Sequence, residues 1–135
     1  MALRLITIPI SHYCDKARWG LERAQLLYQE DAHLQVFHYL PALLAGRSLT
    51  VPVLGHDDGV ITESGDILRW VDERHLKGAP LYPKDKMGEI LALETRFDEV
   101  LGPTGRVEMY QHMLPYPEML QRYGCTGVPP WQQRA

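Results

Sequence analysis

The order of apolar and polar positions predicts alternating strands and helices over the first half of the chain. Residues 3–8 are apolar or β-branched in most positions and stop at Pro9, which is typical of a strand. Apolar residues then recur at helical spacing and predict a helix from about 12 to 28, with Ser11 in the N-cap position. These apolar positions are Cys14, Ala17, Leu21, Ala24 and Tyr28.

Shorter elements follow this first strand and helix. Residues 32–36 are a weaker strand candidate, and residues 37–45 predict a short helix that Gly46 ends. Residues 51–54 and 59–62 predict two strands, because Asp58-Gly59 between them is a strong hairpin signal. Ser64 can cap the next helix, whose inward positions are Ile67, Leu68 and Val71.

The second half of the chain predicts helices after a linker. Glycine and proline at 78–83 break the pattern, and apolar positions at helical spacing resume at Ile90, Leu93, Phe97 and Leu101. Gly102-Pro103 should kink or end this helix, because proline removes a backbone donor. Residues 106–114 are helical again, and an irregular tail is expected after Pro115. The order β-α-β-α-β-β-α predicts an α/β fold, a mixed sheet with helices on both faces.

Length, composition and charge exclude several classes of function. The chain has 135 residues, which is room for one domain or one domain plus part of another. A net charge of −3 with interspersed signs argues against nucleic acid as a partner. The apolar runs are too short to span a membrane, and no signal peptide is recognised. Cys14 and Cys125 make no disulfide framework, and the six histidines show no metal-ligand spacing, so we expect a cytoplasmic protein without a metal.

Three segments in this order resemble the thioredoxin-like N-terminal domain of the glutathione S-transferase superfamily, and most closely its bacterial members. They are Ser-His-Tyr-Cys-Asp-Lys-Ala-Arg-Trp at 11–19, Thr-Val-Pro-Val-Leu at 50–54 and Glu-Ser-Gly-Asp-Ile-Leu at 63–68. Leu-Tyr-Pro at 81–83 is similar to the linker into the family's all-helical C-terminal domain. The resemblance covers about residues 1–114. It implies a thioredoxin-like glutathione-binding domain over 1–78, and a linker with one or two helices of a truncated all-α domain over 79–135.

The resemblance also implies roles for single residues. Ser11 stands where the family has its catalytic side chain, and there a hydroxyl and the helix dipole favour the thiolate of glutathione. Val51 would pair its backbone with the cysteinyl amide of glutathione, next to a cis bond at Pro52. Glu63 would bind the γ-glutamyl ammonium, and Ser64 the neighbouring carboxylate at the start of a helix.

Plainer interpretations of these residues stay open. Ser11 and Ser64 are also ordinary helix caps, and Pro52 could be an edge-strand proline. Cys14 has the position of the second cysteine in a C-x-x-C pair, but Ser11 takes the first, so no internal dithiol cycle can form. Cys14 is then either packed in the helix or itself active on mixed disulfides, which needs an accessible thiol with a lowered pKa. His38 is a candidate for the glycine carboxylate, without a firm motif.

The function implied by the resemblance is a detoxifying transferase that activates the glutathione thiol for attack on a small electrophile. Glutathione is the co-substrate, and a homodimer through the helix from about 85 to 114 is expected. Family members continue through several more helices, so the electrophile pocket is expected to be open and turnover poor. Two rivals remain. One is a non-catalytic glutathione-binding or interaction module, and the other is a thiol transferase that depends on Cys14.

Overall fold

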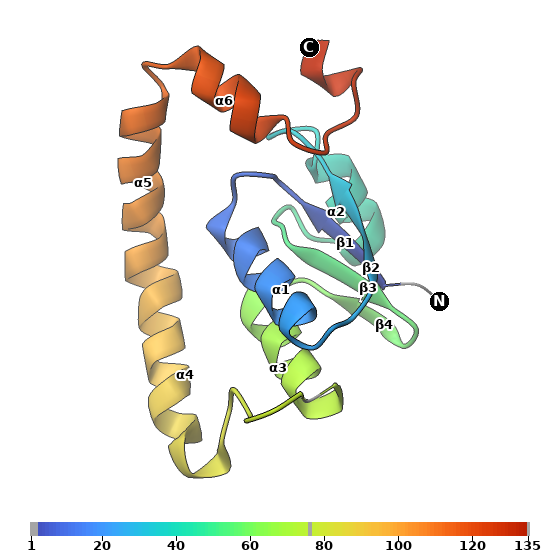
Figure 1. Cartoon of the computed structure of the whole chain (residues 1–135), viewed down its shortest axis with the longest axis vertical. Helices are drawn as coiled ribbons and strands as arrows, with labels where there is room; N and C mark the ends of the chain where they lie inside the picture. The colour runs from blue at the N-terminus through green and yellow to red at the C-terminus, as the bar shows by residue number, and fades with distance from the viewer. Residues whose placement is uncertain (1–2, 76, 135) are drawn as a thin grey trace.

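A mixed sheet forms the centre of the first half of the chain (Figure 1). The computed structural model describes residues 3–75 and 77–134. The strands of this sheet are β1 (Leu3–Thr7), β2 (Tyr28–Ala32), β3 (Val53–His56) and β4 (Gly59–Ile61). Their order is β2-β1-β3-β4, with β1 parallel to β2, and with β3 antiparallel to both β1 and β4. This is the mixed sheet that the sequence predicts.

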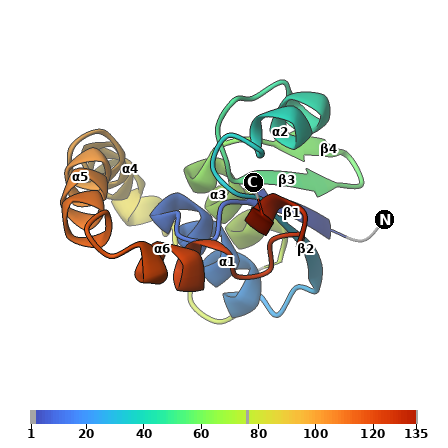
Figure 2. The same cartoon turned by 90° about the horizontal axis from the view of Figure 1, so that it is seen from above.

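Helices cover both faces of the sheet because the strands alternate their apolar side chains. Leu5 and Leu54 pack with α1 (His12–Arg23) and α3 (Ser64–Arg74) on one face. Their neighbours Ile6 and Val53 pack with α2 (Tyr39–Gly46) on the other face. Figure 2 shows α2 on the side of the sheet opposite α1 and α3. This arrangement is the thioredoxin-like fold, and it confirms the fold class expected from the sequence.

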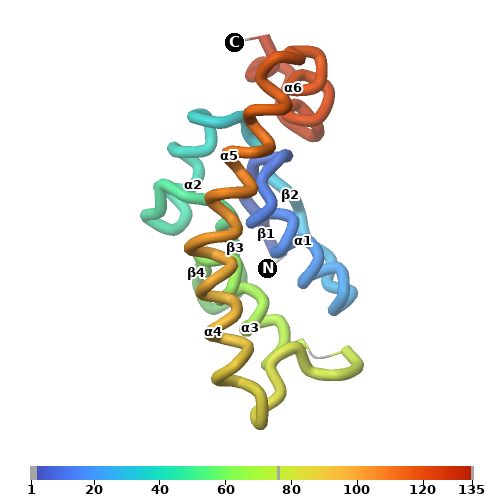
Figure 3. Tube along the Cα trace, turned by 90° about the vertical axis from the view of Figure 1, so that its left-hand side faces the viewer, coloured from blue at the N-terminus to red at the C-terminus, as the bar shows by residue number. Residues whose placement is uncertain are grey.

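A long helical column follows the linker (Figure 3). It consists of α4 (Met87–Arg96), a π-helical turn at Phe97–Leu101, and α5 (Gly102–Met113). Pro103 does not end the helix, because the wider π turn precedes it and proline is tolerated in the first turn of α5. No helix within residues 3–75 and 77–134 is long and apolar enough to cross a bilayer.

Two expected boundaries and one expected loop are wrong. The helix predicted for 12–28 ends at Arg23, because Gln25 adopts a left-handed φ of 56°. Tyr28, which fits the helical stripe, begins β2 instead, so the strand expected at 32–36 lies at 28–32. The tail expected to be irregular contains α6 (Pro117–Gly124) and a 3₁₀ turn at Gln132–Arg134. Pro117 opens α6 because proline is favoured at the first helical position.

The helical column is tied to the first half of the chain along α1 and α3. The Tyr13 hydroxyl donates to the backbone carbonyl of Asp98 at 2.9 Å. Lys16 Nζ lies 2.8 Å from Glu94 Oε1, and Arg69 donates to Glu94 Oε2 at 2.8 Å. These contacts hold the column beside the start of α1, where a cavity opens.

Candidate functional site

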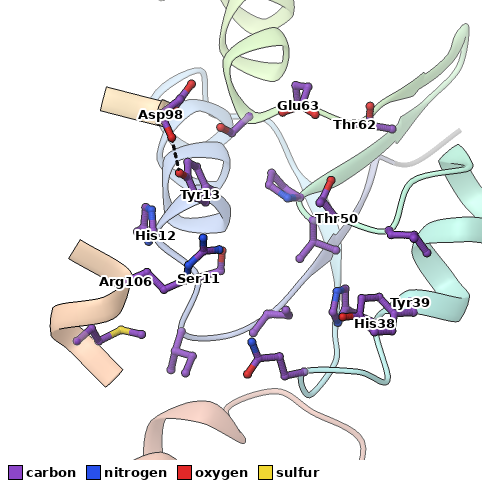
Figure 4. Close-up of a pocket in the computed structure, with 18 of the residues that line it drawn as sticks. Ser11, His12, Tyr13, His38, Tyr39, Thr50, Thr62, Glu63, Asp98 and Arg106 are labelled. Carbon is purple, nitrogen blue, oxygen red and sulfur yellow. Dashed lines mark hydrogen bonds between the residues drawn. The ribbon is translucent and has the colours of Figure 1, made fainter. Parts of the chain in front are cut away.

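A cavity of about 410 Å³ lies where five segments meet (Figure 4). The segments are the turn before α1, the connection between β2 and α2, the loop before β3, the start of α3, and the helical column. Six of the seven residues that the sequence assigns to a site line this cavity: Ser11, His38, Val51, Pro52, Glu63 and Ser64. The structure therefore brings together positions that are more than 50 residues apart in sequence.

Ser11 is placed by the start of α1. Its backbone is extended, with φ −84° and ψ 119°, which is typical of an N-cap. Its Oγ accepts a long hydrogen bond of 3.4 Å from the backbone N–H of Cys14. The Ser11 hydroxyl also carries a hydrogen that it can donate, and it lies at the positive end of the α1 dipole. An anionic sulfur in the cavity would be stabilised by both effects.

Cys14 does not line the cavity. Its side chain is 0% exposed and lies one turn inside α1. Burial raises the pKa of the Cys14 thiol, and this outweighs the lowering effect of hydrogen bonds with Ser11 and the backbone of Ile8. A buried, protonated thiol is the opposite of the accessible thiolate that a reactive cysteine needs.

The loop before β3 has the backbone geometry expected from the sequence. The Val51–Pro52 peptide bond is cis, as the resemblance implies. Both residues line the cavity, as does Thr50, which is labelled in Figure 4.

The start of α3 is an uncapped helix N-terminus at the cavity. Glu63, not Ser64, is the N-cap residue, and its side chain makes no capping hydrogen bond. Ser64 is the first helical residue, so the expected cap at Ser64 is displaced by one position. The first backbone N–H groups of a helix have no intrahelical acceptor. Uncapped, they form a site suited to an anion such as a carboxylate.

His38 lines the cavity next to Tyr39 (Figure 4). Its side chain is 5% exposed, and its Nδ1 atom is buried without a hydrogen-bond partner within the described residues. Burial lowers the pKa of His38, and this outweighs the opposing effect of the nearby backbone of Leu49 and Leu34. A buried polar atom without a partner is rare in native structures.

Several residues that line the cavity were not predicted from the sequence. Arg106 projects from α5 opposite Ser11 and His12 (Figure 4), and no ion pair engages it in the described part of the chain. Burial, and then the charge of Arg106, lower the pKa of His12. The spacing of Asp98, Gly102 and Arg106 at every fourth residue places them on one helical face. That spacing was the available signal, but nothing in the sequence says that this face meets α1.

The cavity contains no cluster suited to a metal. Among the residues that the structure describes, no group of three His, Cys, Asp or Glu side chains could hold a metal ion. The chemistry offered by the cavity is that of hydroxyls, helix N-termini and single charges.

A model of the glutathione S-transferase N-terminal domain matches residues 5–78, which is more than half of the chain. The chain belongs to the glutathione S-transferase family. The thioredoxin-like fold agrees with this assignment. No curated protein matches the chain in sequence.

Solved glutathione transferases share the fold. The Tau class enzyme from mango, Mangifera indica, is 23% identical, with a TM-score of 0.69 over 76% of this chain and 48% of that one. Transferase F2 from Populus trichocarpa is 16% identical, with a TM-score of 0.68 over 81% and 54%. A homologue from Drosophila mojavensis, solved with bound glutathione, is 24% identical, with a TM-score of 0.58 over 71% and 45%.

The chain spans about half the length of these solved structures. At such identities the similarity establishes the fold alone. The three structures come from plants and an insect, and a specifically bacterial relationship stays a prediction.

Proposed function

We propose that this chain binds glutathione across the N-termini of α1 and α3, and activates its thiol for attack on a small electrophile. One observation carries the proposal. A single cavity joins a hydroxyl at the start of α1 to an uncapped N-terminus at the start of α3. Glutathione carries a thiol near its centre and a carboxylate at each end, so it presents an anion to each of these two helix starts.

Each residue then has a role. The sulfur lies beside Ser11, the backbone of Val51 next to cis-Pro52 pairs with the cysteinyl amide, and the γ-glutamyl group meets Glu63 and Ser64. His38 lines the same cavity and is assigned to the glycine carboxylate. In this proposal residues 1–78 are the glutathione-binding domain, and residues 79–135 are the linker and a helical segment. No metal takes part, and the free thiols of Cys14 and Cys125 suit a reducing cytoplasm.

A non-catalytic glutathione-binding module is the second candidate. It is favoured by the exposed apolar face of the helical column, where Phe97 is 51% and Leu101 is 60% exposed. An electrophile held loosely on such a face would lose the benefit of fixed orientation. A thiol transferase that depends on Cys14 has less support, because the Cys14 thiol is buried and its pKa is raised.

The ionisation of bound glutathione tests thiol activation. The ultraviolet absorbance of the thiolate is followed as pH rises, with protein in excess over glutathione. We expect bound glutathione to ionise at lower pH than free glutathione, and to conjugate a standard aromatic electrophile slowly. Binding with unchanged ionisation and no conjugation would contradict activation and support the binding module.

A further inference from the structure

The C-terminal segment returns to the thioredoxin-like domain and buries two of its side chains. After α6 the chain crosses above the sheet and ends near the connection between β2 and α2 (Figures 1 and 2). Val128 is 4% exposed, and Gln132 is 1% exposed. A glutamine is seldom fully buried unless its amide is hydrogen-bonded, so its partners decide what it does.

Gln132 bonds to two consecutive residues of the β2–α2 connection. The backbone N–H of Leu34 donates to Gln132 Oε1 at 3.0 Å, and Gln132 Nε2 lies 2.9 Å from Nδ1 of His33. A backbone N–H can only donate, so the amide oxygen must face Leu34 and the amide nitrogen must face His33. His33 Nδ1 is therefore an acceptor, and the ring hydrogen is on Nε2.

The surroundings of His33 agree with this tautomer. Its Nε2 lies 3.0 Å from Oδ1 of Asp31, although not in the geometry of a regular hydrogen bond. Asp31 is also paired with Arg4 on β1. Burial acts to raise the pKa of Asp31, but Arg4 and His33 outweigh it and lower the pKa. His38 is a further titratable group near His33.

The connection that Gln132 holds is part of the cavity. It includes Gln35 and His38, both of which line the cavity, and Gln35 also accepts a hydrogen bond of 3.0 Å from the Tyr110 hydroxyl. Between them Val36 has a φ of 78°, which is unfavourable for a β-branched residue. Such a backbone persists only when its surroundings fix it. Trp131 adds an edge-to-face contact with Phe37, with ring centroids 5.4 Å apart.

We propose that Gln132 is a positioning residue for the glutathione site. It clamps His33 and Leu34, and so holds the connection in the conformation that places Gln35 and His38 at the cavity. This inference rests on the proposed function, because it assigns the C-terminal segment a part in glutathione binding.

Three variants separate this role from a general loss of stability. Gln132→Ala leaves the Leu34 N–H and His33 Nδ1 without partners. Gln132→Glu keeps an oxygen for Leu34, but replaces the donor that faces His33 Nδ1 by an acceptor. Gln133→Ala is the matched control, because the exposed Gln133 bonds only to the carbonyl of Val128 in its own segment.

Two readouts report on the connection without glutathione. Hydrogen exchange follows the amides of His38 and Tyr39, which bond to the carbonyls of Leu34 and Val36. Long-range ¹H–¹⁵N spectra identify the tautomer of His33. We expect the wild type and Gln133→Ala to show an Nε2–H imidazole and protected amides. Gln132→Ala should lose both features, whereas α1 and the sheet stay protected. Unchanged exchange at His38 and Tyr39 in both Gln132 variants, or an Nδ1–H imidazole in the wild type, would overturn the proposal.

Calorimetry then measures glutathione binding by the same proteins. If the competent conformation falls to about a fifth of the molecules, the Kd rises about fivefold. We expect this change for Gln132→Ala and Gln132→Glu, and none for Gln133→Ala. Exposed His38 and Tyr39 amides with an unchanged Kd would overturn the positioning role. Wild-type protein that binds no glutathione would contradict the proposed function instead. The contacts of Gln132 with His33 and Leu34 would then be tested only by hydrogen exchange and by the tautomer of His33.

Discussion

Gly102 on α5 lies so close to Tyr13 on α1 that a Cβ built at Gly102 would be 2.2 Å from the Tyr13 hydroxyl oxygen. The same hydroxyl donates to the carbonyl of Asp98 on the preceding turn. Glycine at 102 is thus required by close approach, and the Tyr13–Asp98 bond ties the helical column to the start of α1.

Gly102→Ala should destabilise the protein by displacing the Tyr13 hydroxyl. Gly105→Ala is a matched control, because nothing lies within 4 Å of a Cβ at that helical glycine. Alanine favours a helix over glycine, so the control should be neutral or gain up to about 1 kcal/mol. We expect Gly102→Ala to be about 1 to 2 kcal/mol less stable than the control in urea unfolding. The difference should shrink in a Tyr13→Phe background, and equal stabilities would contradict the packing described.

Ser11 and Cys14 make opposite predictions for activity. Ser11→Gly removes the hydroxyl but keeps a fair N-cap, so it should cost only a few tenths of a kcal/mol in stability. Bound glutathione should nevertheless lose its lowered ionisation in Ser11→Gly. Cys14→Ala should keep thiol activation and lose about 1 kcal/mol of stability from the buried core. Loss of conjugation in Cys14→Ala, with activity retained in Ser11→Gly, would favour the thiol-transferase alternative.

Glu94 should make stability depend on pH at the acid end. Burial alone would raise its pKa, but Lys16, Tyr82 and Arg69 together lower it below the ordinary value of 4.5. A depressed folded-state pKa adds stability that is present above about pH 4.5 and is lost as pH falls through the folded pKa. Glu94→Gln should flatten this fall and cost about 1 to 3 kcal/mol at neutral pH. The exposed Glu89 on the same helix supplies the control Glu89→Gln, whose acid unfolding curve should match the wild type.

The exposed apolar face of the helical column predicts a homodimer. Leu93, Phe97 and Leu101 lie on this face, and apolar patches of that kind are unusual on a stable monomer. Light scattering at tens of micromolar should give twice the mass of one chain, and Phe97→Glu should shift it to the monomer. Monomeric wild-type protein at that concentration would remove the basis for the dimer.

The local order of the fold was readable from the sequence, whereas its long-range packing was not. In a strand, neighbouring side chains point to opposite faces, so the apolar neighbours Leu5 and Ile6 indicate a sheet that is covered on both faces. The end of α1 was missed because Tyr28 satisfies both a helical stripe and a strand. Arg106 was missed because it reaches the cavity only through the approach of α5 to α1. Gln132 was missed for the same reason, since it contacts residues almost 100 positions earlier.

The candidate site likewise contains residues that the sequence predicts and features that depend on long-range packing. Five of the predicted site residues lie in short motifs whose order along the chain is recognisable. All five line the cavity: Ser11, Val51, Pro52, Glu63 and Ser64. The burial of Cys14 follows from its place one turn inside α1. The unpaired Nδ1 of His38 depends on the β2–α2 connection, whose conformation is set by distant residues and has no local sequence signal.

Calorimetric titration of glutathione against the wild type and the Glu63→Gln, Ser64→Ala double variant tests the central claim most directly. Glu73→Gln, near the other end of α3, is the control. Removing both groups at the start of α3 should weaken binding by about 2 kcal/mol, which is about thirtyfold in Kd, and the control should leave it unchanged. Equal affinity in the double variant and the wild type would contradict the placement of glutathione across the two helix N-termini.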